Sequence, residues 1–96
     1  MVTVKITPEE SMLVEKSFYQ YNASLDIIAH LSKQVGINQE YLKEYIKNSE
    51  EYYHEMEKNK AQVGNKYKPK DRTDYGYRFN FDACEINYYT PEENVL

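Results

Sequence analysis

Two apolar series with helical spacing constrain this chain more than any other feature. Each has seven positions separated alternately by four and three residues, one between Val14 and Val35 and the other between Leu42 and Val63. A breaker containing Gly36 and Asn38 separates the two series. Such spacing is typical of amphipathic helices, and the arrangement predicts an antiparallel helical hairpin with a coiled-coil-like seam. The expected seam positions are Val14, Phe18, Tyr21, Leu25, Ile28, Ser32 and Val35, facing Leu42, Ile46, Ser49, Tyr53, Met56, Lys60 and Val63.

Capping signals set the expected ends of the two helices. Thr7 is followed by a proline and by Glu10 three positions later, which is a capping box with proline at the first helical position. Gly36 can serve as a left-handed stop, Asn38 can cap the second helix, and another glycine stands just after Val63. We therefore expect helices over about 8–35 and 38–63.

The rest of the chain has strand patterns. Residues 2–6 alternate apolar and polar with β-branched side chains, which predicts a short strand. A polar connector over 65–74 precedes a segment, 75–89, that begins with aromatic residues at every second position from Tyr75 to Phe81. This tail predicts a strand or β-hairpin beside which the N-terminal strand can pair. The sequence thus predicts one α+β domain over all 96 residues, mainly α.

The composition describes a polar chain that can still build a core. The mean hydropathy is −0.88, yet 41% of the residues are hydrophobic and eleven are Tyr. No stretch is apolar for long enough to span a bilayer, and a single cysteine, Cys84, fits a reducing, cytoplasmic compartment. A preference for Lys, Asn, Ile, Glu and Tyr is what AT-rich coding produces, and it indicates a bacterial or phage origin.

The residues that could support catalysis or metal binding have plainer explanations. Glu51 and His54 have the spacing of di-iron helix bundles, but they flank the seam and suit a solvated helix surface. A metal site would need two copies of the hairpin. His30 lacks a recognisable catalytic partner, and the acidic neighbours of Cys84 disfavour the thiolate that a nucleophile requires. We expect no enzyme, no metal and no cofactor.

A basic strip with interleaved aromatic residues lies between two acidic regions. Residues 64–80 hold five basic residues against two acidic ones, although the net charge of the chain is −4. Basic residues with aromatic neighbours can bind single-stranded nucleic acid, but a pI near 5.2 argues against that class. A solvated loop is the plainest interpretation of the strip, and the alternatives are a contact for an acidic partner or for the acidic face of the chain itself.

Each helix also carries apolar residues beside the predicted seam, which need cover from the tail, from a second copy or from a partner protein. On the first helix they are Leu13, Ile27, Ala29 and Leu31. Tyrosine is enriched at protein interfaces, and the second helix is rich in it. The candidate binding residues are Tyr41, Tyr45, Tyr52, Lys68, Arg72 and Tyr77.

The function that this pattern favours is a non-catalytic protein–protein interaction or self-association module. The oligomeric state stays open. One alternative is an acidic inhibitor, encoded by a phage or mobile element, of a nucleic-acid-handling enzyme. The second is a metal-binding helical bundle formed on dimerisation.

Overall fold

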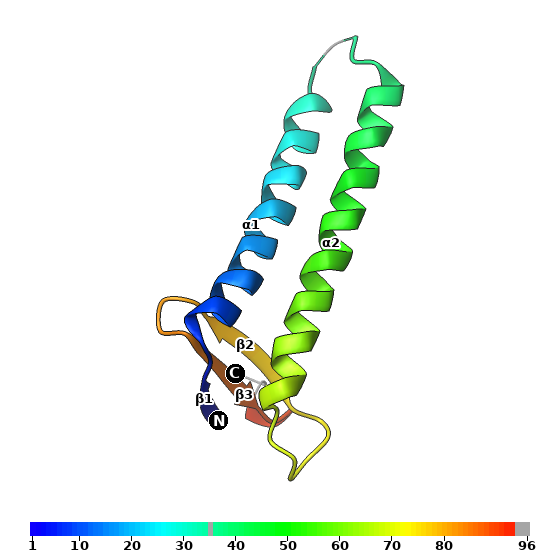
Figure 1. Ribbon diagram of the computed structural model, residues 1–96. Helices are drawn as coiled ribbons and strands as arrows, with labels where there is room; N and C mark the ends of the chain where they lie inside the picture. Colours follow the sequence, from blue (N-terminus) through cyan, green and yellow to red (C-terminus); the bar gives the residue numbers. More distant parts are fainter. Residues whose placement is uncertain (35, 94–96) are drawn as a thin grey trace.

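The computed structural model describes residues 1–34 and 36–93 and confirms a mainly α fold with a small sheet. A long helical hairpin packs at one end against a three-stranded antiparallel sheet, and the molecule is 54 Å long (Figure 1). The elements are β1 (Val2–Lys5), α1 (Pro8–Leu31), α2 (Gln39–Tyr67), β2 (Gly76–Asn80) and β3 (Glu85–Tyr89).

Helix α1 begins with the predicted capping box. The Thr7 hydroxyl accepts a 3.1 Å hydrogen bond from the Glu10 amide, and the Glu10 carboxylate accepts one of 3.0 Å from the Thr7 amide. The helix ends at Leu31, earlier than expected, where the Ser32 hydroxyl bonds back to the Ile28 carbonyl at 2.8 Å. Gly36 has a left-handed φ of 80°, but it lies five residues beyond the end of α1, in the turn that leads to α2, so its interpretation as the stop of the first helix was wrong. The predicted seam position Val35 lies outside the described residues.

Helix α2 begins after its predicted cap but runs four residues further than predicted. The Asn38 side chain accepts a 2.8 Å hydrogen bond from the Glu40 amide, and the helix continues through Gly64 to Tyr67. Gly64 is buried inside the helix, where it lets an aromatic ring of the tail come close. The interpretation of this glycine as a stop was therefore wrong, and the connector begins at Lys68.

The tail forms the β2–β3 hairpin, and β1 pairs with β3, so that the strand order is β1-β3-β2. The N-terminal strand thus lies beside the second strand of the tail, one place away from the first. The reason is burial: β3 carries the fully buried Ile86 and Tyr88, and the central position of a sheet gives these side chains cover from both sides.

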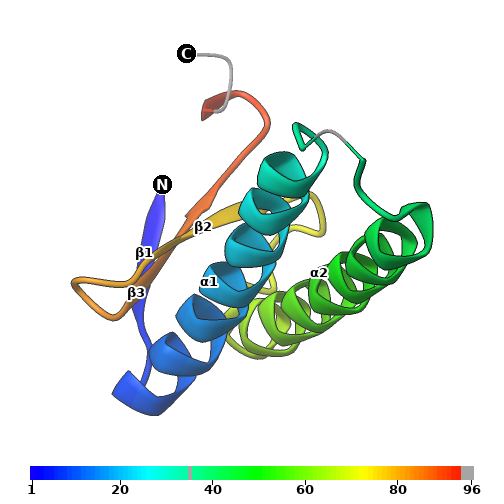
Figure 2. The same cartoon turned by 90° about the horizontal axis from the view of Figure 1, so that it is seen from above.

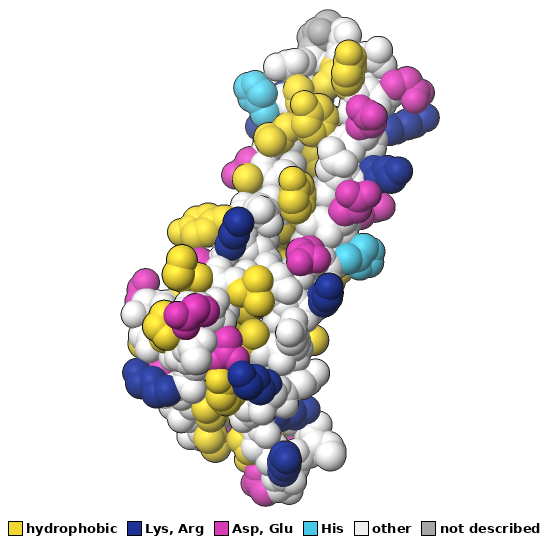
Figure 3. Space-filling view, viewed as in Figure 1, with side chains coloured by type: hydrophobic (Ala, Val, Ile, Leu, Met, Phe, Trp, Pro, Cys, Tyr) yellow, Lys and Arg dark blue, Asp and Glu magenta, His cyan; other side chains and the backbone are white. Residues whose placement is uncertain are grey.

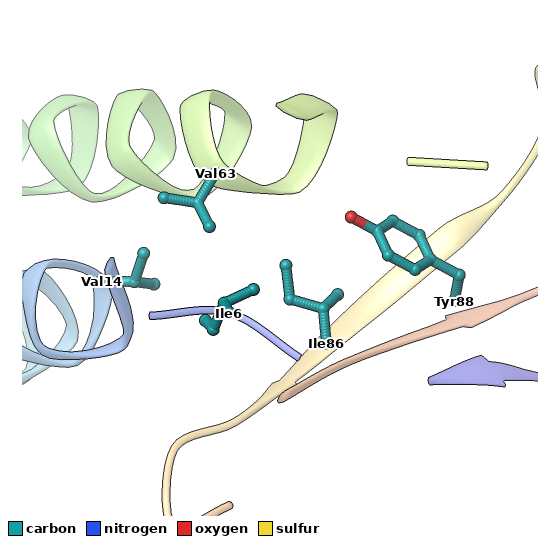
Figure 4. Close-up of a cluster of buried hydrophobic side chains, with 5 residues drawn as sticks. All are labelled: Ile6, Val14, Val63, Ile86 and Tyr88. Carbon is teal, nitrogen blue, oxygen red and sulfur yellow. The ribbon is translucent and has the colours of Figure 1, made fainter. Parts of the chain in front are cut away.

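The core lies where α1 begins, α2 ends and the sheet meets both. Val14 of α1 and Val63 of α2 point toward Ile6 and toward Ile86 and Tyr88 of β3 (Figure 4). In Figure 2 the sheet lies to one side of the hairpin, next to α1. The remaining part of the hairpin, residues 20–31 of α1 and 39–55 of α2, projects beyond the sheet, and we call it the distal arm.

The seam between the helices differs in part from the predicted one. Val14, Ser49, Met56 and Val63 are buried as expected, whereas Leu25, Ile46 and Tyr53 are exposed. Their expected places are taken by small polar residues.

Ser17 and Ser24 of α1 are buried in this seam, and so is Asn59 of α2. The Asn59 amide donates a 2.7 Å hydrogen bond to the Ser17 hydroxyl, while both serine hydroxyls donate to carbonyls of their own helix. Small side chains allow the helices to approach closely, which turns the larger apolar residues toward the edges of the seam.

Candidate interaction surface

A shallow groove of about 250 Å³ runs between the two helices of the distal arm. Its apolar residues are Ile27, which is 45% exposed, Tyr45 at 39% and Tyr52 at 40%. In Figure 3, hydrophobic side chains gather along the line between the helices in the upper half of the hairpin. The full lining is Gln20, Ala23, Ser24, Ile27, Tyr45, Asn48 and Tyr52.

Helical geometry places these residues together and turns them away from the sheet. Tyr45 and Tyr52 are seven residues apart, which puts them on one face of α2 two turns from each other. On α1, the ring of Phe18 packs on that of Phe81, in the turn between β2 and β3, with 5.7 Å between the ring centroids. Ile27 follows Phe18 by nine residues, or two and a half turns, and therefore points to the opposite side.

Tyr41 lies near the groove without lining it. Its side chain is 62% exposed and borders a separate depression with Asn38, Glu40 and Glu44. Because it precedes Tyr45 by one helical turn, it extends the aromatic face of α2 toward the tip of the hairpin.

The two margins of the groove differ in charge. On α2, Glu44 precedes Asn48 by four residues and Glu51 and Glu55 follow it by three and seven, so all three lie on one edge with it and this margin is acidic. On α1, the corresponding edge carries Lys16 and His30, seven residues on either side of Ala23, and one carboxylate, Asp26, three residues after it. All six charged or titratable side chains are on the exposed surface.

The other three candidate residues are used within the chain and lie at the opposite end of the hairpin. The Lys68 amine donates to the Thr73 carbonyl at 3.2 Å. Arg72 donates two hydrogen bonds of 2.8 Å to the Asp74 carboxylate, and these lower the pKa of Asp74 against the opposing effect of burial. Such contacts shape the connector that follows α2.

Tyr77 belongs to the packing of the core. Its ring lies against Gly64 and makes aromatic contacts with Phe79 and Tyr88, at centroid distances of 5.8 and 5.9 Å. The structure therefore brings Tyr45 and Tyr52 together in one groove and places Lys68, Arg72 and Tyr77 elsewhere.

Neither the pair Glu51 and His54 nor the cysteine is among the residues that line this groove. Glu51 and His54 are exposed, and among residues 1–34 and 36–93 no three His, Cys, Asp or Glu side chains gather as a metal site would require. Cys84 is half-buried in the turn before β3, where it adopts a φ of 51° and its thiol lies 3.9 Å from the Phe81 carbonyl.

One polar residue has a larger role than the sequence indicated. Besides capping α1, the Glu10 carboxylate accepts hydrogen bonds from the Lys66 amine at 2.7 Å and the Tyr67 hydroxyl at 2.6 Å, both at the end of α2. Burial acts to raise the pKa of Glu10, but these bonds and those from Thr7 outweigh it and lower the pKa to about 2. The capping box was the only sequence pattern that pointed to a role for Glu10, and it did not reveal the contacts with α2.

Comparisons of the chain with protein-family models, with curated proteins and with solved structures found no match. None of the helices within the described residues has the length and apolar character needed to cross a membrane.

Proposed function

We propose that this protein is a non-catalytic protein–protein interaction module whose contact surface is the groove of the distal arm. The observation that carries the proposal is the uncovered apolar groove formed by Ile27, Tyr45 and Tyr52. Contiguous apolar patches on soluble proteins commonly mark binding sites, and tyrosine is among the residues that contribute most to binding free energy.

The shape and charge of the groove favour a protein over other ligands. Its volume of about 250 Å³ lies below the range of roughly 300 to 1,000 Å³ that is typical of small-molecule pockets, and it is open along the hairpin. Nucleic acid is disfavoured because Glu44, Glu51 and Glu55 would face its phosphates. A protein surface can cover the rings and leave the carboxylates at a hydrated rim.

Site-specific photo-cross-linking tests the proposal. A photoreactive phenylalanine analogue replaces Tyr52 in cells that naturally produce the protein, and covalent adducts are detected after irradiation. We expect adducts from this position and none from the same analogue at Lys47, which is exposed on the outer side of α2. If neither Tyr52 nor Tyr45 yields an adduct above the Lys47 level, the proposed function is wrong.

A further inference from the structure

We infer that the occupant of the groove is a second copy of this chain, bound face to face with both hairpins pointing in the same direction. In this arrangement α1 of each copy lies on α2 of the other, and the four helices form an antiparallel bundle. The inference rests on the proposed function and names the partner.

The face that holds the groove is large enough for a dimer. From Leu13 to Leu31, α1 extends for about 28 Å, and two adjacent helices are about 20 Å wide, which gives a footprint of roughly 560 Å². The accessible area of a ridged helical face exceeds its footprint, so the face approaches the roughly 800 Å² per partner of a standard interface. The sheet lies on the other side and leaves this face free along the hairpin (Figure 2).

The contact between Ser17 and Asn59 shows which residues of the two helices lie at the same level. Because the helices are antiparallel, a residue ten positions after Ser17 on α1 lies level with the residue ten positions before Asn59 on α2. Ile27 is therefore level with Ser49. That level falls between Tyr45 and Tyr52 of α2. A two-fold axis parallel to the hairpin preserves levels, so Ile27 of one copy inserts between Tyr45 and Tyr52 of the second copy.

The charges at the margins favour this orientation. With both hairpins pointing the same way, the acidic α2 margin of one copy meets the α1 margin of the other. Lys16 then comes within one to two helical turns of Glu55, and His30 within one turn of Glu44. Asp26 comes within one turn of Glu51, which is the one pair of like charges among these side chains in this orientation. With the hairpins pointing in opposite directions, α2 would lie on α2 and these carboxylates would repel each other.

The opposite face of the distal arm is a poorer candidate, although Leu25, Ile46 and Tyr53 are exposed there. The Tyr53 ring already packs on Tyr21, with 5.4 Å between the centroids. The sheet also projects on this side of the hairpin, so a second hairpin laid along it would meet the strands.

Light scattering and sedimentation of the purified protein test the arrangement. We expect a dimer that Ile27→Asp converts to a monomer and that Leu25→Asp, the matched change on the opposite face, leaves intact. Circular dichroism establishes that both variants are folded. A protein that stays monomeric at every concentration, or a dimer that Ile27→Asp does not weaken, overturns the inference.

Charge reversal tests the orientation. Each dimer contains the pair of Lys16 and Glu55 twice, so Lys16→Glu and Glu55→Lys should each weaken dimerisation about two- to thirtyfold. The double variant restores opposite charges and should recover most of the affinity. If the single changes have no effect or the double variant is weaker than both, the orientation is wrong.

The mass of the photo-cross-linked adducts separates this inference from the proposed function. Adducts from Tyr52 at twice the 11.5 kDa of the chain support the second copy. Adducts at other masses alone retain a protein–protein function and overturn self-association, whereas the absence of adducts overturns both.

Discussion

Tyr88 is completely buried, and its hydroxyl donates a 2.5 Å hydrogen bond to the backbone carbonyl of Gly64. Burial raises the pKa of Tyr88 to about 12, because the phenolate would lose its solvation. The ring of Tyr77 covers the same glycine so closely that a Cβ there would lie 2.6 Å from a ring carbon. These two tyrosines explain why a glycine stands inside α2.

Replacing Gly64 with alanine should therefore destabilise the protein by about 1 to 3 kcal/mol. The ring of Tyr77 must move, and this cost exceeds the gain of about 1 kcal/mol in helix propensity. Urea unfolding followed by far-UV circular dichroism measures the change. Asn65→Ala, at the next and exposed position, is the control and should stay within about 0.5 kcal/mol. A Gly64→Ala variant as stable as the parent would contradict the close contact.

Glu10 makes the free energy of unfolding depend on pH in the acid range. Since the pKa of Glu10 is lowered from 4.5 to about 2 by folding, its contribution is complete above about pH 4.5 and is lost as the pH falls toward 2. Glu10→Gln should lower the free energy of unfolding at neutral pH by about 1 to 2 kcal/mol. It should also weaken the pH dependence of that free energy between pH 4.5 and 2.

Urea unfolding of both proteins across this pH range provides the measurement. Glu9→Gln removes a neighbouring, exposed carboxylate from the same helix turn and is the control. Parallel pH profiles for Glu10→Gln and the parent would show that the bonds from Lys66 and Tyr67 contribute nothing.

At the scale of the elements, the helical hairpin and the strands could be predicted because each carries a clear hydrophobic period and its own cap. The orientation of the helices about their axes could not. Buried Ser17 and Ser24 satisfy their hydroxyls on their own helix, so they can enter the seam while the hydropathy pattern points to Phe18 and Leu25.

The candidate surface was predictable to a similar extent. Ile27, Tyr45 and Tyr52 stand out as apolar residues beside the seam, but their meeting in one groove depends on the level at which the helices pack. The placement of Arg72 was not predictable, because its partner Asp74 is brought to it by the shape of the connector. Tyr77 could not be assigned to the core without knowing that Gly64 lies inside α2.

The packing of the seam gives a prediction at Ser24. It distinguishes a seam that is close because its residues are small from one that has room for a larger apolar side chain. Ser24→Leu places a larger side chain where the helices are close and should destabilise the monomer by about 1 to 3 kcal/mol. Ser24→Ala removes a hydroxyl that bonds only within α1 and should change stability by less than about 1 kcal/mol. Chemical unfolding compares the two. A stabilising effect of Ser24→Leu would instead favour a seam that can accept a larger apolar residue at this position.

At the scale of the whole molecule, the buried residues gather at the end of the hairpin that meets the sheet. Opening the distal arm exposes fewer buried side chains than opening the base does. Hydrogen–deuterium exchange followed by mass spectrometry should therefore show weaker protection in peptides from 20–31 and 39–55 than in peptides from β3. Equal protection along the hairpin would contradict this gradient.

The same measurement responds to dimerisation. As the protein concentration rises, protection should increase in the distal arm, because a second copy covers it. Peptides from β3 should change less and serve as the internal reference. An unchanged distal arm at concentrations where light scattering reports a dimer would place the interface elsewhere.

The strand order has a consequence for the timing of folding. Val2 of β1 pairs with Tyr88 of β3, so β1 is synthesised well before the strand that it pairs with. The sheet cannot form until β3 has left the ribosome. Meanwhile α1 and α2 have already emerged, held together by their own seam and by the bond between Ser17 and Asn59. A newly made chain thus passes through a stage in which Val14 and Val63 remain open to water until β3 arrives, and synthesis that pauses there would leave the molecule open to aggregation.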